Sequence, residues 1–190
     1  MLLHAAMRSA IFIERDGVLN EAPIKNGHAQ PPRHMEEFRI KPEAHQVLLR
    51  LKDAGYLLIV TTNQPGLADG SLCRTELDLM HRFLRGRLPI DDILVCPHAD
   101  NDNCHCHKPE AGLFTEAAFK WHLDMDFSFV VSDKWQDAAA AHVAGCTSIM
   151  INSPLTGSGH HDFVTPSFTA AADKILGLHI PHATTTAAVA

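Results

Sequence analysis

Short apolar runs alternate with amphipathic segments along most of the chain. The runs at 9–13, 56–60, 92–96, 127–131 and 147–152 have the length and composition of buried strands. The segments 42–55, 73–88, 112–123, 135–145 and 169–176 carry apolar residues at helical spacing. Strands that alternate with helices predict an α/β fold with a parallel, doubly wound, Rossmann-like sheet covered by helices on both faces.

Two intervening stretches, 23–38 and 154–166, are rich in proline, glycine and polar residues, and they predict loops. A chain of 190 residues is close to the size of one domain of roughly 150 residues. We therefore expect a single domain over residues 1–178. Residues 179–190, with three consecutive threonines and several alanines, are typical of a flexible tail.

Composition and charge narrow the possible functions. Apolar residues make up 46% of the chain and the formal net charge is −6. No basic stripe of the kind that binds nucleic acid is present, and no apolar run approaches the ~20 residues of a membrane span. The N-terminus lacks the pattern of a signal peptide. We expect a cytoplasmic protein with no nucleic-acid or membrane partner.

Polar clusters follow four of the predicted strands or lie close beyond them. Glu14 and Asp16 follow the first strand, Thr62 and Asn63 the second, Lys108 comes after the third, and Asp133 and Asp137 follow the fourth. Ligands bind at the carboxyl ends of parallel strands, so these side chains predict an active site. Two carboxylates two residues apart can take separate roles in catalysis, one attacking and one moving a proton.

These four clusters resemble the four motifs of haloacid dehalogenase phosphatases. The resemblance spans residues 10–150 and implies that Glu14 attacks phosphorus, Asp16 transfers protons, and Thr62 and Lys108 stabilise the phosphoryl charge. It also implies a Mg²⁺ ion held by Glu14, Asp16 and Asp133, with support from Asp137.

A cysteine-rich loop predicts a second metal site. Cys96, His98, Cys104 and Cys106 form a Cys₃His set, which structural Zn²⁺ prefers in closed tetrahedral sites. No ligand position is left open, so this metal is expected to stabilise the loop 96–106. His105 and His107 are rival ligands by position.

A zinc loop between the second and third motifs is similar to one subgroup of this superfamily. That subgroup contains heptose bisphosphate phosphatases and histidinol-phosphatases, and its members lack a large cap domain. The resemblance implies that the following residues contact substrate: Arg15, Asn20, Asn63, His107 and Lys134. His107 stands where the subgroup commonly has Arg, and an Arg would clamp a phosphate with two hydrogen bonds.

Glu14 departs from the motif, whose nucleophile is normally Asp. One extra methylene moves the attacking oxygen by about an ångström, which can cost ~10²-fold in rate. Two hypotheses follow. The first is a working phosphomonoesterase acting on a small phosphorylated metabolite, a heptose bisphosphate or, alternatively, histidinol phosphate. The second is a non-catalytic relative that binds a phosphorylated ligand or a partner. A nucleic-acid end phosphatase is a third reading, which the acidic charge opposes. A monomer is favoured, although the sequence leaves the oligomeric state open.

Overall fold

The computed structural model describes residues 7–178. Its main sheet has six parallel strands in the order β5-β4-β1-β6-β7-β8. The strands are β1 (Ala10–Glu14), β4 (Leu57–Asn63), β5 (Asp92–Cys96), β6 (Phe129–Ser132), β7 (Thr147–Ile151) and β8 (Phe163–Thr165). A separate antiparallel hairpin consists of β2 (Ile24–Lys25) and β3 (His28–Ala29). The predicted α/β class with a parallel sheet is confirmed.

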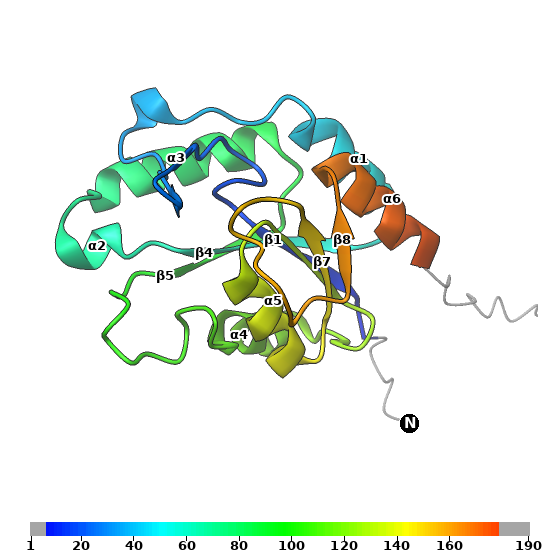
Figure 1. Cartoon of the computed structure of the whole chain (residues 1–190). Helices are drawn as coiled ribbons and strands as arrows, with labels where there is room; N and C mark the ends of the chain where they lie inside the picture. Colours follow the sequence, from blue (N-terminus) through cyan, green and yellow to red (C-terminus); the bar gives the residue numbers. More distant parts are fainter. Residues whose placement is uncertain (1–6, 179–190) are drawn as a thin grey trace, which may run out of the picture.

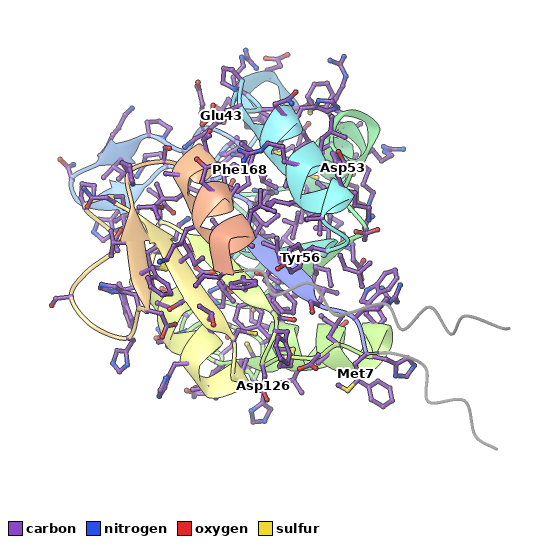
Figure 2. The ribbon with its side chains drawn as sticks, turned by 90° about the vertical axis from the view of Figure 1, so that its right-hand side faces the viewer. Met7, Glu43, Asp53, Tyr56, Asp126 and Phe168 are labelled. Carbon is purple, nitrogen blue, oxygen red and sulfur yellow. The ribbon has the colours of Figure 1, made fainter. Side chains whose placement is uncertain are left out.

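Helices cover both faces of the sheet, as Figure 1 shows. The helices α1 (Ala44–Asp53), α3 (Arg74–Arg87) and α6 (Phe168–Leu178) pack on one face, and α4 (Gly112–Trp121) and α5 (Trp135–Ala144) pack on the other. Two short elements, η1 (Met35–Glu37) and α2 (Gly66–Asp69), lie in the connections. Figure 2 shows α1 and α6 on the same side of the sheet, where Arg50 and Asp173 form a 2.7 Å ion pair between them.

The central strand β1 shows why the sheet needs two covering layers. Ile11 and Ile13 belong to the apolar cluster under α1, α3 and α6, whereas Ala10 and Phe12 belong to the cluster under α4 and α5. All four are fully buried. Successive side chains of a strand point to opposite faces, so an unbroken apolar run can be satisfied only between two layers. Each large side chain buried in this way contributes about 1.5–3 kcal/mol.

The strand order places β1 at the point where the chain changes direction across the sheet. From β1 the chain builds outward through β4 and β5, and it then returns to add β6 on the other side of β1. Crevices that bind ligands form beside such switch points, beyond the carboxyl ends of the strands. Glu14, the last residue of β1, therefore stands at the centre of that edge.

Three expectations about local structure were wrong. The stretch 23–38 contains the β2–β3 hairpin and η1, and the stretch 154–166 contains β8. These strands have two or three residues, so they carry no apolar run that periodicity could detect. The strand β4 extends to Asn63, because Thr62 and Asn63 continue the pairing with Val95 and Cys96 of β5.

Within residues 7–178, no helix is both long and apolar enough to cross a membrane. The expected tail at 179–190 lies outside the described residues. The cytoplasmic location expected from the sequence stays a prediction.

Candidate active site

Four segments deliver polar side chains to the carboxyl edge of the sheet. Glu14 ends β1, Thr62 and Asn63 end β4, Asp133 follows β6, and Lys108 comes from the loop after β5. They surround a pocket of about 280 Å³. Its lining consists of Glu14, Asp16, Ala29, Pro31, Asn63, Pro65, Asp100, His107, Lys108, Lys134, Gln136 and Asp137.

A buried lysine joins two carboxylates at the base of the pocket. The Lys108 ammonium donates to Glu14 Oε2, to Asp137 Oδ1 at 2.6 Å and to the Thr61 carbonyl at 3.2 Å. Burial lowers the pKa of Lys108, but the charges of Asp137 and Glu14 outweigh it and leave the pKa above its ordinary value. Burial also raises the pKa of Asp137 to about 6, against the opposing charge of Lys108. A fixed positive charge thus stands beside Glu14.

Asp16 is held by four hydrogen-bond donors. Arg15 donates from Nε to Oδ1 at 3.1 Å and from Nη2 to Oδ2 at 2.9 Å. Asn20 donates to Oδ1 at 2.9 Å, and Gln64 donates to Oδ2 at 2.8 Å. Burial alone raises the pKa of Asp16, but the Arg15 charge, with Lys134 and the hydrogen bonds, holds it below its ordinary value. Asp16 is therefore a carboxylate, and it has to release a partner before it can carry a proton.

Arg15 and Asn20 lie next to the pocket residue Asp16. Both side chains are fully buried, neither lines the pocket, and both bind Asp16. Arg15 also donates from Nη1 to His81 Nε2 at 3.0 Å and stacks over the Phe38 ring at 5.8 Å. In the described structure both side chains hold Asp16 in place, and the expected contact with substrate stays a prediction.

Three oxygens converge on the Lys134 ammonium. Lys134 donates to the Asp16 carbonyl and to Asp133 Oδ1 at 3.0 Å, and its Nζ lies 3.7 Å from Glu14 Oε1. Although burial lowers the pKa of Lys134, the surrounding carboxylates, Glu14 foremost, raise it above its ordinary value. The same three residues were expected to hold Mg²⁺. Hard oxygen donors of this kind fit that ion, and Lys134 has to turn away to admit it.

Gly17 allows this convergence. Its φ is +99°, a conformation that favours glycine, and a Cβ there would lie 2.5 Å from Asp133 Oδ2. The Asp133 carbonyl is anchored from the other side, where Ser153 Oγ donates to it at 2.7 Å and Thr156 Oγ1 at 3.3 Å. Backbone and side chain of Asp133 are thus both fixed.

Thr62 and Asn63, at the end of β4, connect β4 to Glu14 and to Lys108. Thr62 Oγ1 donates weakly to Glu14 Oε1 at 3.5 Å and accepts from Gln64 at 2.7 Å. The Asn63 side chain exchanges two hydrogen bonds with the Lys108 backbone, at 3.1 and 3.2 Å. Thr62 is fully buried, whereas Asn63 lines the pocket. These contacts set the distance between β4 and the loop that carries Lys108.

The cysteine-rich loop brings its predicted ligands together. One ligand atom from each of Cys96, His98, Cys104 and Cys106 lies within 4.8 Å of all the others. The Cys96 Sγ lies 3.7 Å from the Cys104 Sγ, and the His98 Nδ1 lies 3.2 Å from the Cys106 Sγ. A tetrahedral zinc site with Zn–S bonds of about 2.3 Å has S···S edges of about 3.8 Å. The set therefore fits Zn²⁺ in chemistry and in size.

The rival ligands take other positions. His105 is exposed, and its carbonyl lies so close to Gly112 that a Cβ there would be 2.1 Å away. His107 Nδ1 approaches Cys96 Sγ at 3.6 Å, but His107 Nε2 pairs with Asp100 Oδ1 at 3.2 Å at the pocket rim. His107 thus links the metal loop to the pocket.

Sequence reasoning missed three contributors. Gln64 bridges Asp16 and Thr62, and its place right after Asn63 was a usable signal. His81 reaches Arg15 from α3, 66 residues away, and nothing in the sequence marks it. Gln136 lines the pocket beside Lys134. Together the site offers three buried carboxylates, those of Glu14, Asp16 and Asp137, and the ammonium groups of Lys108 and Lys134. This combination suits transfer of an anionic phosphoryl group.

Comparisons with known proteins agree with this chemistry. A family model described as HAD-hydrolase-like matches residues 105–176. The chain is 34% identical over 157 residues to D-glycero-beta-D-manno-heptose-1,7-bisphosphate 7-phosphatase of Rhodopseudomonas palustris, covering 76% of this chain and 84% of that protein. It is 31% identical to the histidine biosynthesis bifunctional protein HisB of Blochmanniella floridana, over 73% of this chain and 40% of HisB.

A solved structure extends the likeness to the fold. The D,D-heptose 1,7-bisphosphate phosphatase of B. bronchiseptica, complexed with magnesium and phosphate, is similar with a TM-score of 0.78 and 27% identity. The match covers 90% of this chain and 99% of that one. The chain therefore belongs to the haloacid dehalogenase-like phosphatases, in the family of the D-glycero-beta-D-manno-heptose-1,7-bisphosphate 7-phosphatases.

Proposed function

We propose that this protein is a magnesium-dependent phosphomonoesterase that acts on a small phosphorylated sugar, a heptose bisphosphate in the first place. The observation that carries the proposal is the meeting of Glu14, Lys108 and Lys134 at one pocket beside the fixed Asp16. The related heptose bisphosphate phosphatases supply the substrate class.

Glu14 is the proposed nucleophile. Its carboxylate attacks phosphorus and forms an acyl phosphate while the sugar oxygen leaves. Lys108 stays beside the attacking group and stabilises the negative charge that spreads over the phosphoryl oxygens. Lys134 lies on the other side of Glu14 and holds a substrate oxygen, and Asn63 fixes the position of Lys108.

Asp16 is the proposed acid and base. After turning away from part of the hydrogen bonds that hold it, Asp16 takes up a proton from solvent and gives that proton to the leaving sugar oxygen. It then takes a proton from the water that hydrolyses the acyl phosphate. Arg15, Asn20 and Gln64 are positioning residues, because each binds Asp16 and none has to touch substrate.

Two metals complete the proposal. Glu14, the Asp16 carbonyl and Asp133 hold Mg²⁺, with Asp137 as support through Lys108; the ion supplies positive charge that polarises the phosphoryl group. Cys96, His98, Cys104 and Cys106 hold Zn²⁺, which keeps the loop 96–106 against the pocket. The single domain over residues 1–178, a monomeric state and the absence of nucleic-acid and membrane partners stay predictions.

Histidinol phosphate is the second candidate substrate. The similarity to HisB supports it, and so does the rim, where His107 pairs with Asp100 instead of presenting a cation to a second phosphate. An anionic Asp100 suits the amino group of such a substrate better than a distal phosphate.

The test is a phosphate-release assay with Mg²⁺ on heptose bisphosphate, other sugar phosphates and histidinol phosphate. Glu14→Gln keeps the size of the side chain but removes the nucleophile, and a fall of about 10³-fold or more in kcat is expected. Glu14→Asp measures the effect of the methylene. Tight binding of the esters without turnover, with activity gained in Glu14→Asp, would overturn the catalytic proposal in favour of a binding role.

A further inference from the structure

A second chamber opens beside the catalytic pocket. It has a volume of about 470 Å³, within the range of small-molecule sites. Its lining consists of Gly27, His28, Ala29, Lys134, Trp135, Gln136, Pro154, Leu155 and Gly157. Ala29, Lys134 and Gln136 also line the catalytic pocket. A phosphate ester held at Lys134 can therefore extend its other end into this chamber.

Trp135, one of the lining residues, combines a partly exposed side chain with a fixed backbone. Trp135 is 46% exposed, although it begins α5 directly after the catalytic segment. The backbone N–H of Trp135 donates to the Leu155 carbonyl at 3.0 Å. Gly157, with φ +66°, packs so closely that a Cβ would lie 3.3 Å from the Trp135 Cβ. The loop that carries Leu155 is itself tied to Asp133 by Ser153.

The β2–β3 hairpin supplies another part of the lining, with Gly27, His28 and Ala29. Its turn residues Asn26 and Gly27 have φ values of 52° and 77°, as the tight turns of two-residue hairpins require. At the open end of the hairpin, the backbone N–H of Gln30 donates to the Pro23 carbonyl at 2.9 Å. His28 and Ala29 of this hairpin thus line the same chamber as the Trp135 segment.

The lining has a definite chemistry. None of its nine residues is acidic, and its polar side chains are His28, Lys134 and Gln136. These groups donate and accept hydrogen bonds around an indole, whose broad apolar face packs against flat, weakly polar rings. A sugar ring has that character, with an apolar C–H face and hydroxyls around its edge. A free phosphate or a small acyl group has no such face.

We infer that this chamber is the subsite for the sugar ring of the substrate, with Trp135 stacking on the ring and Gln136 and His28 bonding its hydroxyls. The inference rests on the proposed phosphatase function and deepens it. Trp135 is then a specificity residue, which distinguishes ring-bearing phosphate esters from small ones without touching the transferred phosphoryl group.

The first experiment compares two substrates in matched variants. Trp135→Ala is expected to lower kcat/KM for a sugar phosphate about 10-fold more than for acetyl phosphate, which has no ring. Trp135→Phe keeps an aromatic face and is expected to recover most of that difference. Phe119→Ala changes an 85% exposed aromatic on α4 that does not line the chamber, and it is the control for general effects. Equal losses for both substrates in Trp135→Ala would overturn the inference.

A second measurement separates this inference from the proposed function. Sugar phosphates are expected to quench the Trp135 fluorescence saturably, whereas inorganic phosphate is not; Trp135→Phe supplies the Trp121 background. If no ester is turned over but the quenching is found, the phosphatase proposal fails and the sugar subsite stands. If turnover is found and sugar phosphates give no more quenching than inorganic phosphate, the phosphatase proposal stands and the sugar subsite is rejected.

Discussion

The Lys108 ammonium lies against a carboxylate oxygen of Glu14, although the two residues are 94 positions apart in the chain. Both side chains are almost fully buried, at 2% and 4% exposure, and Asp137 binds the same ammonium at 2.6 Å. Buried charges persist only when they are paired, so each of the three depends on the others. The longer Glu14 side chain therefore has a fixed partner at the centre of the site.

The first prediction concerns this lysine. Lys108→Met keeps the length of the side chain and leaves two buried carboxylates without their shared cation. We expect the free energy of unfolding to fall by about 3 kcal/mol and kcat to fall by about 10²-fold or more. Urea denaturation and phosphate release measure the two effects. Lys120→Met removes a half-exposed partner of Asp92 and should cost less than about 1 kcal/mol. Wild-type kcat in Lys108→Met would contradict the proposed role.

The second prediction concerns the hydrogen bonds from Arg15 that hold the Asp16 carboxylate. Arg15→Lys keeps the charge but cannot reproduce two hydrogen bonds to Asp16 and one to His81. We expect kcat to fall by about 10-fold or more and stability to fall by roughly 2 kcal/mol. Arg74→Lys, at an exposed pair with Asp78, is the matched control and should change neither. Steady-state kinetics at saturating substrate separates kcat from KM; a change in KM alone would instead indicate a substrate contact.

The third prediction concerns pH and His81. Burial, and then the charge of Arg15, lower the pKa of His81 to about 4 from its ordinary 6.5. Between these values the unfolded chain takes up a proton that the folded protein does not. The stability contributed by neutral His81 is therefore complete above pH 6.5 and is lost as the pH falls toward 4.

Replacement by glutamine removes this titration and keeps an acceptor for Arg15. His81→Gln should lose less stability than the natural protein between pH 6.5 and 4, by about 2–3 kcal/mol. Urea denaturation at several pH values measures the difference. His45→Gln changes an exposed histidine on α1 and should leave the pH dependence as it is. Parallel curves for the natural protein and His81→Gln would refute the assignment.

The fourth prediction concerns the metal loop. The purified protein should contain one Zn²⁺ per chain by atomic emission, and a strong chelator should lower Tm by about 5 °C or more. Cys104→Ser should lose the zinc and show the lower Tm without chelator. Cys73→Ser alters an exposed cysteine outside the cluster and should keep both. Full zinc content in Cys104→Ser would show that another residue ligates the ion.

The fifth prediction concerns Gly17. An alanine there has an unfavourable φ and places its Cβ against the Asp133 carboxylate, so we expect a cost of about 2 kcal/mol or more and weaker activation by Mg²⁺. Gly86→Ala is the control, because nothing lies within 4 Å of its Cβ and alanine favours the helix α3. Thermal unfolding and a magnesium titration of activity measure both effects. An unchanged magnesium response in Gly17→Ala would count against the proposed ion site.

Much of the fold and part of the candidate site were readable in the sequence. The apolar runs predicted five of the six strands of the sheet, and β5 was predicted residue for residue. Parallel strands end at one edge, so the order of the clusters placed Glu14 and Lys108 near each other before any contact was known. The spacing of the Cys₃His set likewise identified residues that the structure brings within 4.8 Å.

The remaining features depend on contacts between distant segments. Arg15 lies between the pocket residues Glu14 and Asp16 in the chain, and a charged side chain at that position can point to solvent or into the protein. It points inward because Asp16 and His81, the latter from α3, both accept its hydrogen bonds, and only the assembled structure brings α3 to that place. The short strands β2, β3 and β8 likewise have no periodic signal, since they exist through their pairing.

The sequence by itself determined the α/β fold, the residue types at the strand ends and the cluster of candidate metal ligands, because burial and ligand spacing are local properties of the chain. Only the tertiary structure decided which of those polar residues face the pocket and which support them from within. The cost of burying Arg15, Asp16 and Lys108 is offset by partners that lie one to 94 residues away, and those pairings become definite only when every layer of the fold is in place.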